Sequence, residues 1–346
     1  MKPALLLLAL LSLAACARVP QPGVTELVYA TPYPPGHPFS RADREWMDFV
    51  EQRSGGSLRI RPSWSGALLS ADHSLVELRH GVADIGLITP IYVKGGVHLI
   101  RIQSGFYSGA TRIESQLALY RCMAAASPQF AHELQGLKVL AVQGGVLPGI
   151  VTRDRQVRSL QDLQGMRLRA PTELLSVLRD LGVDPVSMPM GEVYSALAKG
   201  IIDGVVAPAD TFRSQHFAEV ARYFITLQVP RGAYPARAMG ERRWLSLTPA
   251  QRQVLDEATP VWEAALARQA QRGQDDGYVE ARKGNVQIVD IDPQEQQRFE
   301  QLYLQHARRN ANALQRFGID GGKVLDVARA SLQTDGSVQC AGGKGS

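Results

Sequence analysis

The apolar positions of the chain follow two different periods in turn. Residues 84–88 form a short apolar run, which is typical of a strand that is covered on both faces. Trp46, Phe49 and Val50 recur at the spacing of one helix face, which predicts an amphipathic helix. Because such helices and short apolar strands alternate along most of the chain, the pattern predicts α/β layers with mostly parallel strands.

Turn and cap residues bound the predicted elements. Ser40 is a good N-cap, and Gly55 ends the helix that begins there. The predicted strands span residues 26–30, 58–62, 84–88, 137–142, 166–169, 186–188 and 204–207. Further predicted helices span residues 74–80, 112–126, 173–181 and 193–199.

Two longer helices are predicted in the last third of the chain. Thr248 is an N-cap followed by proline at the first helical position, and the helical pattern runs to about Arg272 or beyond, with a kink expected at Pro260. Such a length is unusual in an α/β protein. Asp292 begins a second helix, which we expect to end at about Arg316.

The N-terminus predicts export. One cation, Lys2, precedes an apolar run at residues 4–13 and the small residues before Cys16, which together describe a secretory signal. The apolar run is too short to span a bilayer, which takes about 20 residues. Residues 13–16, Leu-Ala-Ala-Cys, resemble the bacterial lipobox, in which the cysteine is acylated and becomes the first residue of the mature protein. The alternative is a plain signal that is cleaved near Ala15.

Composition narrows the class of protein. The chain has 346 residues, of which 45% are hydrophobic and 21% charged, so it can bury a large core and fits two domains better than one. Its net charge of +5 is spread along the chain without a basic block. A dedicated nucleic-acid binder would cluster that charge, so we expect no nucleic-acid partner.

The three cysteines are too few for a disulfide-rich scaffold or a multi-cysteine zinc domain. Cys122 and Cys340 remain after removal of the signal, in an oxidising compartment. They form either a disulfide or two separate thiols. The sequence leaves both alternatives open, because it does not give the separation of their Cα atoms.

No motif of a known catalytic centre occurs in the sequence. The metalloprotease H-E-x-x-H, the G-x-S-x-G elbow, the P-loop and the Rossmann glycine pattern are all missing. Asp84, Glu192 and Asp203 are isolated carboxylates rather than an acid–base pair. We therefore expect a protein that is not an enzyme and that holds neither a metal nor a cofactor.

One stretch carries a specific signature. Residues 162–171 read Asp-Leu-Gln-Gly-Met-Arg-Leu-Arg-Ala-Pro, residues 192–197 read Glu-Val-Tyr-Ser-Ala-Leu, and residues 203–208 read Asp-Gly-Val-Val-Ala-Pro. In order and spacing these segments resemble the core signature of the DctP-type solute-binding proteins of TRAP transporters. The long helix after Thr248 and the lipoprotein-type signal also resemble features of that family.

The resemblance implies a two-lobed α/β fold of the periplasmic-binding-protein kind (type II-like), with a long interdomain helix and the ligand enclosed between the lobes. The expected division of the chain has five units, and each lobe is made of two segments. The units are a signal peptide at 1–15, a tether at 16–25, a first lobe at 26–145 and about 235–273, a second lobe at 146–234 and about 274–340, and a disordered tail at 341–346.

The resemblance also places the carboxylate of the ligand against Arg169. A guanidinium suits that role, because it pairs with a carboxylate through two hydrogen bonds and keeps its charge. Arg167 lies two residues away on the same strand face and is the rival. The family pattern selects Arg169, and the alternative is that Arg169 is a solvated residue at the strand end.

Three positions depart from the family pattern. Ala207 stands where the family usually has an asparagine that helps to hold the carboxylate, and Met190 stands where a bulky aromatic is common. Gly149 occupies the register of a second cation, and Arg153 is near but out of register. Either the ligand is less polar than a sugar acid or a short dicarboxylate, or other residues replace the missing donors.

An apolar lining with a few polar anchors is a normal pocket design. Aromatic side chains of the first lobe, Tyr33 among them, are candidates to cover an aromatic or alkyl tail, with core packing as the alternative for each. The predicted ligand-binding residues are Arg169, Met190, Val206, Ala207, His37, Phe39, Trp64, Tyr92 and Phe212.

The resemblance therefore predicts a lipid-anchored periplasmic receptor for a small organic anion. It implies the small and large permease subunits of a TRAP transporter as partners, and Cys16 as the lipid anchor to a membrane. One alternative is a sensor of the same fold that works without a permease. Another is a periplasmic enzyme that acts on a small carboxylate.

Overall fold

The strands form two separate sheets. The computed structural model describes residues 23–93 and 95–341. The first sheet has the order β2-β1-β3-β10-β4 and the second the order β11-β9-β5-β8-β6-β7. The strands of the first sheet are β1 (Thr25–Ala30), β2 (Leu58–Ser63), β3 (Ile85–Leu87), β4 (Leu137–Gln143) and β10 (Tyr234–Gly240). Those of the second are β5 (Gly149–Thr152), β6 (Arg167–Arg169), β7 (Asp184–Val186), β8 (Gly204–Ala207), β9 (Tyr223–Ile225) and β11 (Gln287–Val289).

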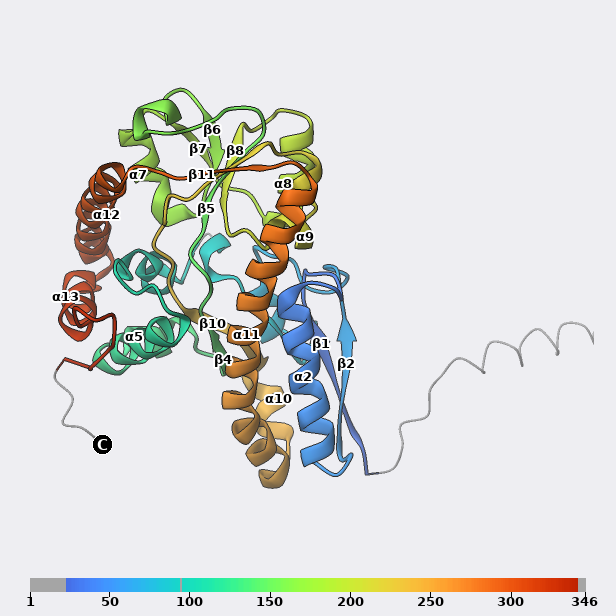
Figure 1. The fold of residues 1–346 in the computed structure, drawn as a ribbon. Coiled ribbons are helices and arrows are strands. Elements are labelled where there is room, and N and C mark those ends of the chain that lie inside the picture. The colour runs from blue at the N-terminus through green and yellow to red at the C-terminus, as the bar shows by residue number, and fades with distance from the viewer. Residues whose placement is uncertain (1–22, 94, 342–346) are drawn as a thin grey trace, which may run out of the picture.

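Helices cover both sheets and give the molecule two lobes (Figure 1). We call each sheet, with the helices that pack on it alone, the first and the second lobe. Seven of the helices are α2 (Pro38–Arg53), α3 (Ser74–Arg79), α4 (His98–Ile102), α5 (Ile113–Ala126), α6 (Gln129–Glu133), α7 (Leu175–Asp180) and α8 (Met190–Ala198). The others are α9 (Thr211–Ser214), α10 (Glu241–Ser246), α11 (Pro249–Lys283), α12 (Pro293–Ala313) and α13 (Gly321–Ser331). The predicted α/β class and two-lobed fold are confirmed.

Each predicted strand and helix is present, with ends shifted by a few residues. The pairing differs from expectation, because β10 runs antiparallel to β3 and β4, and β5 runs antiparallel to β8 and β9. These two strands stand where the chain changes lobes, after β4 and again before β10. A strand that enters a sheet from the other lobe has no crossover helix to return it in the parallel direction.

The long helix α11 spans both lobes. Its first turn carries a capping box, in which the Thr248 side chain accepts from the Gln251 backbone and the Gln251 side chain accepts from the Thr248 backbone. The helix continues through Pro260 for 35 residues. It packs against α2 and β4 of the first lobe and against α9 of the second, and Figure 1 shows it running past both sheets.

The C-terminal helices also connect the lobes. Phe299 and Tyr303 of α12 belong to the core of the second lobe, whereas Ala307 and Ala311, further along the same helix, belong to the core of the first. Helix α13 then packs against α5. The expected placement of all of residues 274–340 with the second lobe does not fit this packing, because the apolar side of α13 is buried on the first lobe.

A disulfide fixes this arrangement. Cys122 in α5 and Cys340 beyond α13 are bonded, with their Cα atoms 5.1 Å apart. Of the two alternatives that the sequence left open, the structure has the bridge. The expected signal peptide, Cys16 and nearly all of the expected tether and tail lie outside the described residues.

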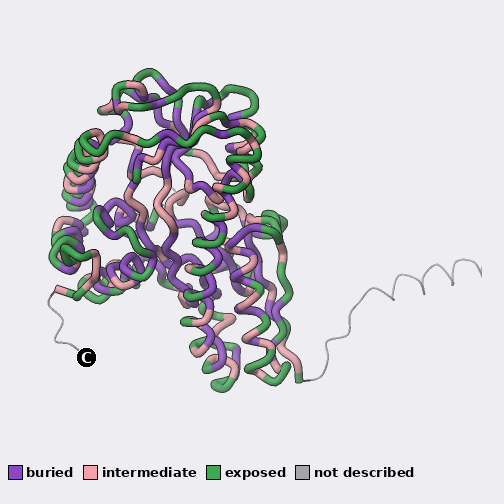
Figure 2. The backbone as a smooth tube through the Cα atoms, viewed as in Figure 1, coloured by how far each residue is buried: buried purple, intermediate pink, exposed green. Residues whose placement is uncertain are grey.

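Burial follows the layers. The strands at the centre of both sheets are buried, whereas the outward sides of α12 and α13 are exposed (Figure 2). Among the described residues, no helix combines the length and the apolar character that crossing a membrane requires.

One buried ion pair joins three elements of the first lobe to α11. Arg237 in β10 donates from Nε to Oδ1 of Asp43 in α2 over 2.9 Å, and both side chains are fully buried. Asp43 also accepts from the Tyr29 hydroxyl in β1 and from Nε1 of Trp262 in α11. Trp262 in turn stacks on Trp46, with ring centroids 3.7 Å apart.

Replacing Asp43 with asparagine should destabilise the protein strongly, because Arg237 would keep its charge in the core without a counter-charge. Removing one partner of a buried ion pair costs roughly 3–5 kcal/mol. Urea unfolding of Asp43→Asn measures this loss in the free energy of unfolding. Asp48→Asn, an exposed change on the same helix, is the control and should stay within about 0.5 kcal/mol of wild type. A loss below about 1 kcal/mol in Asp43→Asn would contradict the assigned role.

The bond between Cys122 and Cys340 should leave neither residue open to thiol labelling in denatured, unreduced protein. The bridge closes a loop of 218 residues, for which loop entropy predicts up to about 5 kcal/mol, and measured gains are often smaller. Peptide mapping by mass spectrometry, with and without reduction, tests the pairing. The double variant Cys122→Ser, Cys340→Ser should unfold at lower urea concentration than wild type; labelled Cys122 or Cys340 without reduction would refute the bridge.

Candidate functional site

A cavity of about 130 Å³ lies between the lobes. Phe39, Thr89 and Tyr92 line it from the first lobe, and Arg169 and Met190 line it from the second. The two lobes touch beside it, because the Thr172 hydroxyl donates to the Ile91 carbonyl over 3.2 Å. A ligand in this cavity would therefore contact both lobes at once.

Arg169 is a buried cation in this cavity and has a side chain that is only 3% exposed. Its Nε donates to the Met188 carbonyl over 3.1 Å and its Nη2 donates to the Tyr92 hydroxyl. No carboxylate of the described residues forms an ion pair with it. Because buried charges are normally paired, this guanidinium is suited to receive an anion that enters the cavity.

The rival arginine is placed differently. Arg167 is the first residue of β6, where its side chain is 51% exposed and forms an ion pair of 2.9 Å with Asp184. It does not line the cavity. Of the two arginines in this strand, only Arg169 combines burial, cavity lining and the lack of a carboxylate partner in the described part of the chain.

A second cation of the cavity, Arg231, was missed in the sequence analysis. It lies in the segment that returns from β9 to β10, and a Cβ placed on Gly145 would lie 2.5 Å from its Cζ. The glycine therefore makes room for the guanidinium. At Gly149, where the family pattern has a cation, a Cβ would collide with the Ile225 carbonyl, so no side chain fits there. Arg231 reaches the cavity from a distant part of the sequence instead.

The cavity also contains one carboxylate, Glu173, in the 3₁₀ turn η5 (Thr172–Leu174). Its Oε2 is buried and has no hydrogen-bond partner among the described residues. Burial raises the pKa of Glu173 to about 7, against the opposing effects of its own backbone N–H, Arg169 and Arg231. The carboxylate is therefore held in its charged form less readily than an exposed one.

The rest of the wall is aromatic or aliphatic. Tyr33 packs edge-on against Phe39 with ring centroids 5.6 Å apart, and burial raises the pKa of the Tyr33 hydroxyl well above its ordinary value. The remaining apolar or aromatic residues at the cavity are Ile91, Tyr92, Pro148, Pro171, Leu174, Met190, Val206, Pro208, Val229, Pro230 and Tyr234. Such a wall suits the apolar body of a ligand whose charged group is held by arginine.

Five of the predicted ligand-binding residues line the cavity: Arg169, Met190, Val206, Phe39 and Tyr92. That they contact a ligand stays a prediction. The residues of the cavity that the sequence analysis did not propose include Arg231, Glu173, Tyr234, Thr89 and Ser104. Segments that cross between the lobes border the cleft. The position of Arg231 in such a segment was therefore the signal that could have marked it as a candidate.

The other four predicted residues do not line the cavity. Val206 and Ala207 are neighbours in β8 and point to opposite faces, so Ala207 enters the core beside α8. Phe212 packs edge-on against Phe224 in the same core. Trp64 packs against Tyr29.

His37 has a structural role beside the cavity. It is the N-cap of α2, and its Nδ1 accepts from the backbone N–H of Phe39 over 3.2 Å. Burial, with a smaller contribution from Arg41, lowers the pKa of His37 to about 3. The neutral ring stacks on Tyr33 with centroids 3.9 Å apart, so His37 supports a wall of the cavity without lining it.

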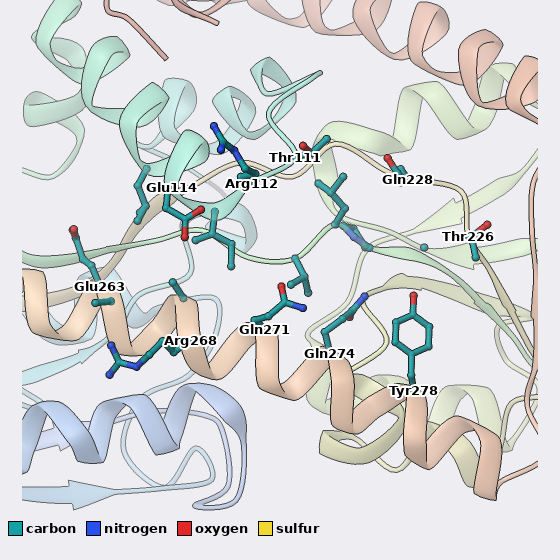
Figure 3. A pocket seen from close by; sticks show the side chains of 18 of the residues that line it. Thr111, Arg112, Glu114, Thr226, Gln228, Glu263, Arg268, Gln271, Gln274 and Tyr278 are labelled. Atoms are coloured by element: carbon teal, nitrogen blue, oxygen red, sulfur yellow. The ribbon is translucent and has the colours of Figure 1, made fainter. Parts of the chain in front are cut away.

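A larger hollow of about 1090 Å³ runs along α11 (Figure 3). Figure 3 shows Gln271, Gln274 and Tyr278 of α11 facing the segment that carries Thr226 and Gln228. The lining of this hollow mixes polar and apolar side chains, and none of the predicted ligand-binding residues lines it. The cavity between the lobes, with its unpaired buried arginine, is therefore the candidate site.

Comparison with known proteins identifies the family of the chain. The DctP model, described as bacterial extracellular solute-binding protein, family 7, matches residues 29–312. A solute-binding protein of Albidiferax ferrireducens is 26% identical over 202 residues, which are 56% of this chain and 56% of that protein. A solute-binding protein of Roseobacter denitrificans is 30% identical over 154 residues, which are 42% of this chain and 45% of that protein. The chain thus spans about half the length of these curated relatives.

Solved structures agree with this assignment over a larger part of the chain. A TRAP solute-binding protein from Rhodoferax ferrireducens in complex with copurified benzoate is 25% identical, with a TM-score of 0.80 over 89% of this chain and 97% of that one. A TRAP periplasmic solute-binding protein from Desulfovibrio salexigens is 26% identical, with a TM-score of 0.69 over 88% of this chain and 94% of that one.

Replacing Glu173 with glutamine should stabilise the ligand-free protein at pH 8 but not near pH 4. The pKa of Glu173 rises from 4.5 to about 7 on folding, so the folded protein binds more protons than the unfolded chain between these pH values. The contribution of Glu173 to stability is therefore lost as pH rises through this window, by up to about 3 kcal/mol. Urea unfolding of ligand-stripped wild type and Glu173→Gln from pH 4 to pH 8 measures the difference.

Two comparisons make this measurement specific. Asp210, whose pKa burial raises to about 6, titrates in the same window but is present in both proteins and cancels in the difference. Glu192→Gln removes an exposed carboxylate from the same lobe and should follow the wild-type profile. Parallel pH profiles for wild type and Glu173→Gln would contradict the assigned burial of Glu173.

Proposed function

This chain belongs to the DctP family, family 7 of the bacterial extracellular solute-binding proteins, and on that premise we propose that it is the extracytoplasmic receptor of a TRAP transporter. In this proposal it binds a small organic carboxylate between its two lobes and delivers it to the small and large membrane subunits of the permease. The family is described as solute-binding proteins, which supports a receptor rather than an enzyme.

One observation carries the proposal: Arg169 is buried in the cavity without a carboxylate partner in the described residues. A guanidinium has five N–H groups, and two of those on Arg169 donate to Met188 and Tyr92. The remaining N–H groups can pair with a carboxylate in the two-pronged geometry that arginine favours. Arg231 adds a second positive charge to the same cavity.

The wall of the cavity favours a ligand with an apolar or aromatic body. Ala207, at the position of the usual asparagine, lies in the core, so β8 presents only Val206 to the cavity. Phe39, Met190 and Val206 offer dispersion contacts but no hydrogen bonds. The copurified benzoate of the Rhodoferax ferrireducens relative is a ligand of this chemical class, which supports the same class here.

Hydrogen bonds across the cleft define a state of the receptor in which the two lobes are joined. The Arg169–Tyr92 and Thr172–Ile91 hydrogen bonds join the second lobe to the first beside the cavity. A ligand held by Arg169 against Tyr92 would stabilise this joined state, because it adds contacts to both lobes. We propose that the permease binds the joined state in preference to the separated one.

A periplasmic enzyme is the less favoured candidate. No histidine or cysteine of the described residues lines the cavity, so the nucleophile–base arrangements that such residues supply are not found there. Calorimetry followed by chromatography of the bound ligand tests this point. A receptor returns the ligand unchanged at a stoichiometry near one, whereas recovery of a converted product would favour an enzyme.

Replacing Arg169 with alanine should weaken carboxylate binding by at least about thirtyfold. Loss of one partner of a buried charged pair costs roughly 2–5 kcal/mol, and each 1.4 kcal/mol is a factor of ten in Kd. Arg169→Lys should restore only part of the affinity, because an ammonium lacks the two-pronged geometry. Calorimetry on ligand-stripped protein, with benzoate as the first probe of a carboxylate panel, gives the Kd values.

Arg167→Ala is the matched control for Arg169→Ala. It removes an exposed arginine from the same strand and should leave Kd within about twofold of wild type, because a surface ion pair contributes little. Equal affinities of wild type and Arg169→Ala for every bound carboxylate would remove Arg169 from the site and overturn the mechanism.

We further propose that Cys16 carries the lipid that holds the receptor at the membrane, since the lipobox-like residues 13–16 precede it. Several acyl chains anchor a protein stably, whereas one chain does so weakly. Intact mass of detergent-extracted protein should show acyl chains, and Cys16→Ser should move the protein to the soluble periplasmic fraction. A mature N-terminus without acyl mass would contradict the anchor.

A further inference from the structure

Glu173 differs from the other buried acids of the protein. Asp43 accepts hydrogen bonds from three side chains, and Glu133 accepts from the backbone N–H groups of Leu99 and Ile100. By contrast, Oε2 of Glu173 is buried with no partner, and it is the only carboxylate oxygen so placed in residues 23–93 and 95–341. An unsatisfied buried acceptor is costly, so a position that retains one requires an explanation.

Neither arginine of the cavity satisfies this oxygen. Arg169 lies four residues earlier in the chain and Arg231 lies in the segment that crosses between lobes, and both attract the Glu173 carboxylate electrostatically. Yet no ion pair or hydrogen bond joins Glu173 to either cation in the described structure, where Oε2 stays without a partner. The acid is therefore not a built-in counter-ion of the anion site.

The hydroxyls of the protein do not satisfy it either. Five hydroxyl-bearing residues line the same cavity, namely Tyr33, Thr89, Tyr92, Ser104 and Tyr234. Within the described part of the chain none of them donates to Oε2 of Glu173. Glu173 thus lines the cavity with a carboxylate that keeps a free acceptor position at Oε2.

We propose that Glu173 accepts a hydrogen bond from a hydroxyl group of the ligand, so that the receptor selects a hydroxylated carboxylate with an apolar body over its unsubstituted parent. This inference rests on the proposed function, because it assumes that Arg169 holds the carboxylate of the same ligand. Arg169 then binds the carboxylate of the ligand, and Glu173 accepts a hydrogen bond from its hydroxyl.

A neutral hydroxyl suits this position better than an ammonium. The charged residues that line the cavity are Arg169, Arg231 and Glu173. With Glu173 ionised and the carboxylate of the ligand added, two positive and two negative charges balance. An ammonium would add an unbalanced positive charge close to two guanidinium groups in a poorly solvated space, which is costly.

Such a site discriminates strongly between a ligand with the hydroxyl and one without it, because the hydrogen bond to Glu173 is lost when the hydroxyl is missing. A site built to hydrogen-bond a hydroxyl rejects the analogue without it, since the buried acceptor of the protein then stays unpaired. Hydrogen bonds to charged groups are the stronger ones. We expect the best-placed hydroxyl to improve affinity by at least about tenfold over the parent acid.

The test uses four matched probes: benzoate and its three monohydroxy isomers. Calorimetry on ligand-stripped wild type should show at least one isomer that binds about tenfold or more tightly than benzoate. In Glu173→Leu, which keeps the bulk and removes the acceptor, that preference should vanish. In Glu173→Gln, which keeps a neutral acceptor, it should shrink to a few-fold. Glu192→Gln, an exposed change on the same lobe, should retain the full preference.

The possible outcomes separate this inference from the proposed function. Benzoate binding that depends on Arg169, with no gain from any hydroxyl, contradicts the role of Glu173 alone. A hydroxyl preference that survives in both Glu173 variants contradicts it as well. Absence of binding by all four probes contradicts the aromatic-acid receptor and this inference together. Circular dichroism and thermal unfolding establish that each variant is folded, and Glu173→Gln provides the test if Glu173→Leu is not.

Discussion

The carboxylate of Asp43 is the point at which the first lobe is tied to the long helix. Its two oxygens accept from Tyr29 in β1, Arg237 in β10 and Trp262 in α11, while Asp43 itself belongs to α2. Because all of these groups are buried, removal of any one leaves a polar group without a partner in the core. The position of α11 is therefore specified by electrostatics as well as by apolar packing. As α11 continues to α9 of the second lobe, the frame around the cleft depends on this cluster.

The two most buried arginines of the described structure show how one residue type supports a fold in one place and a function in another. Arg237 has a carboxylate partner inside the protein, whereas Arg169 has none. In the cavity the protein keeps two cations and one acid without joining them. Such an arrangement lowers the stability of the ligand-free protein, and a bound ligand with the complementary groups compensates for it. Binding sites often carry this trade between stability and function.

Local sequence patterns determined most of the elements but only part of the site. The strand–helix–strand signature at residues 162–208 places Arg169 correctly in the cavity, because strand ends and helix starts there depend on neighbouring residues. Arg231 was not predicted, because the room for its side chain in the cavity depends on the distant Gly145. The antiparallel strands β5 and β10 were missed for a related reason, since they form where the chain changes lobes. His37, Trp64 and Phe212 were predicted as site residues, but capping and core packing use them, and sequence does not distinguish these roles.

The two ends of the described chain are both held by the first lobe. Strand β1 lies between β2 and β3, and the disulfide attaches Cys340 to α5 of that lobe. The second lobe is therefore an internal part of a closed loop and bears no load when the two described ends are pulled apart. Such a force would shear β1 along its two parallel neighbours, the direction in which a pair of strands resists most because its hydrogen bonds must break together.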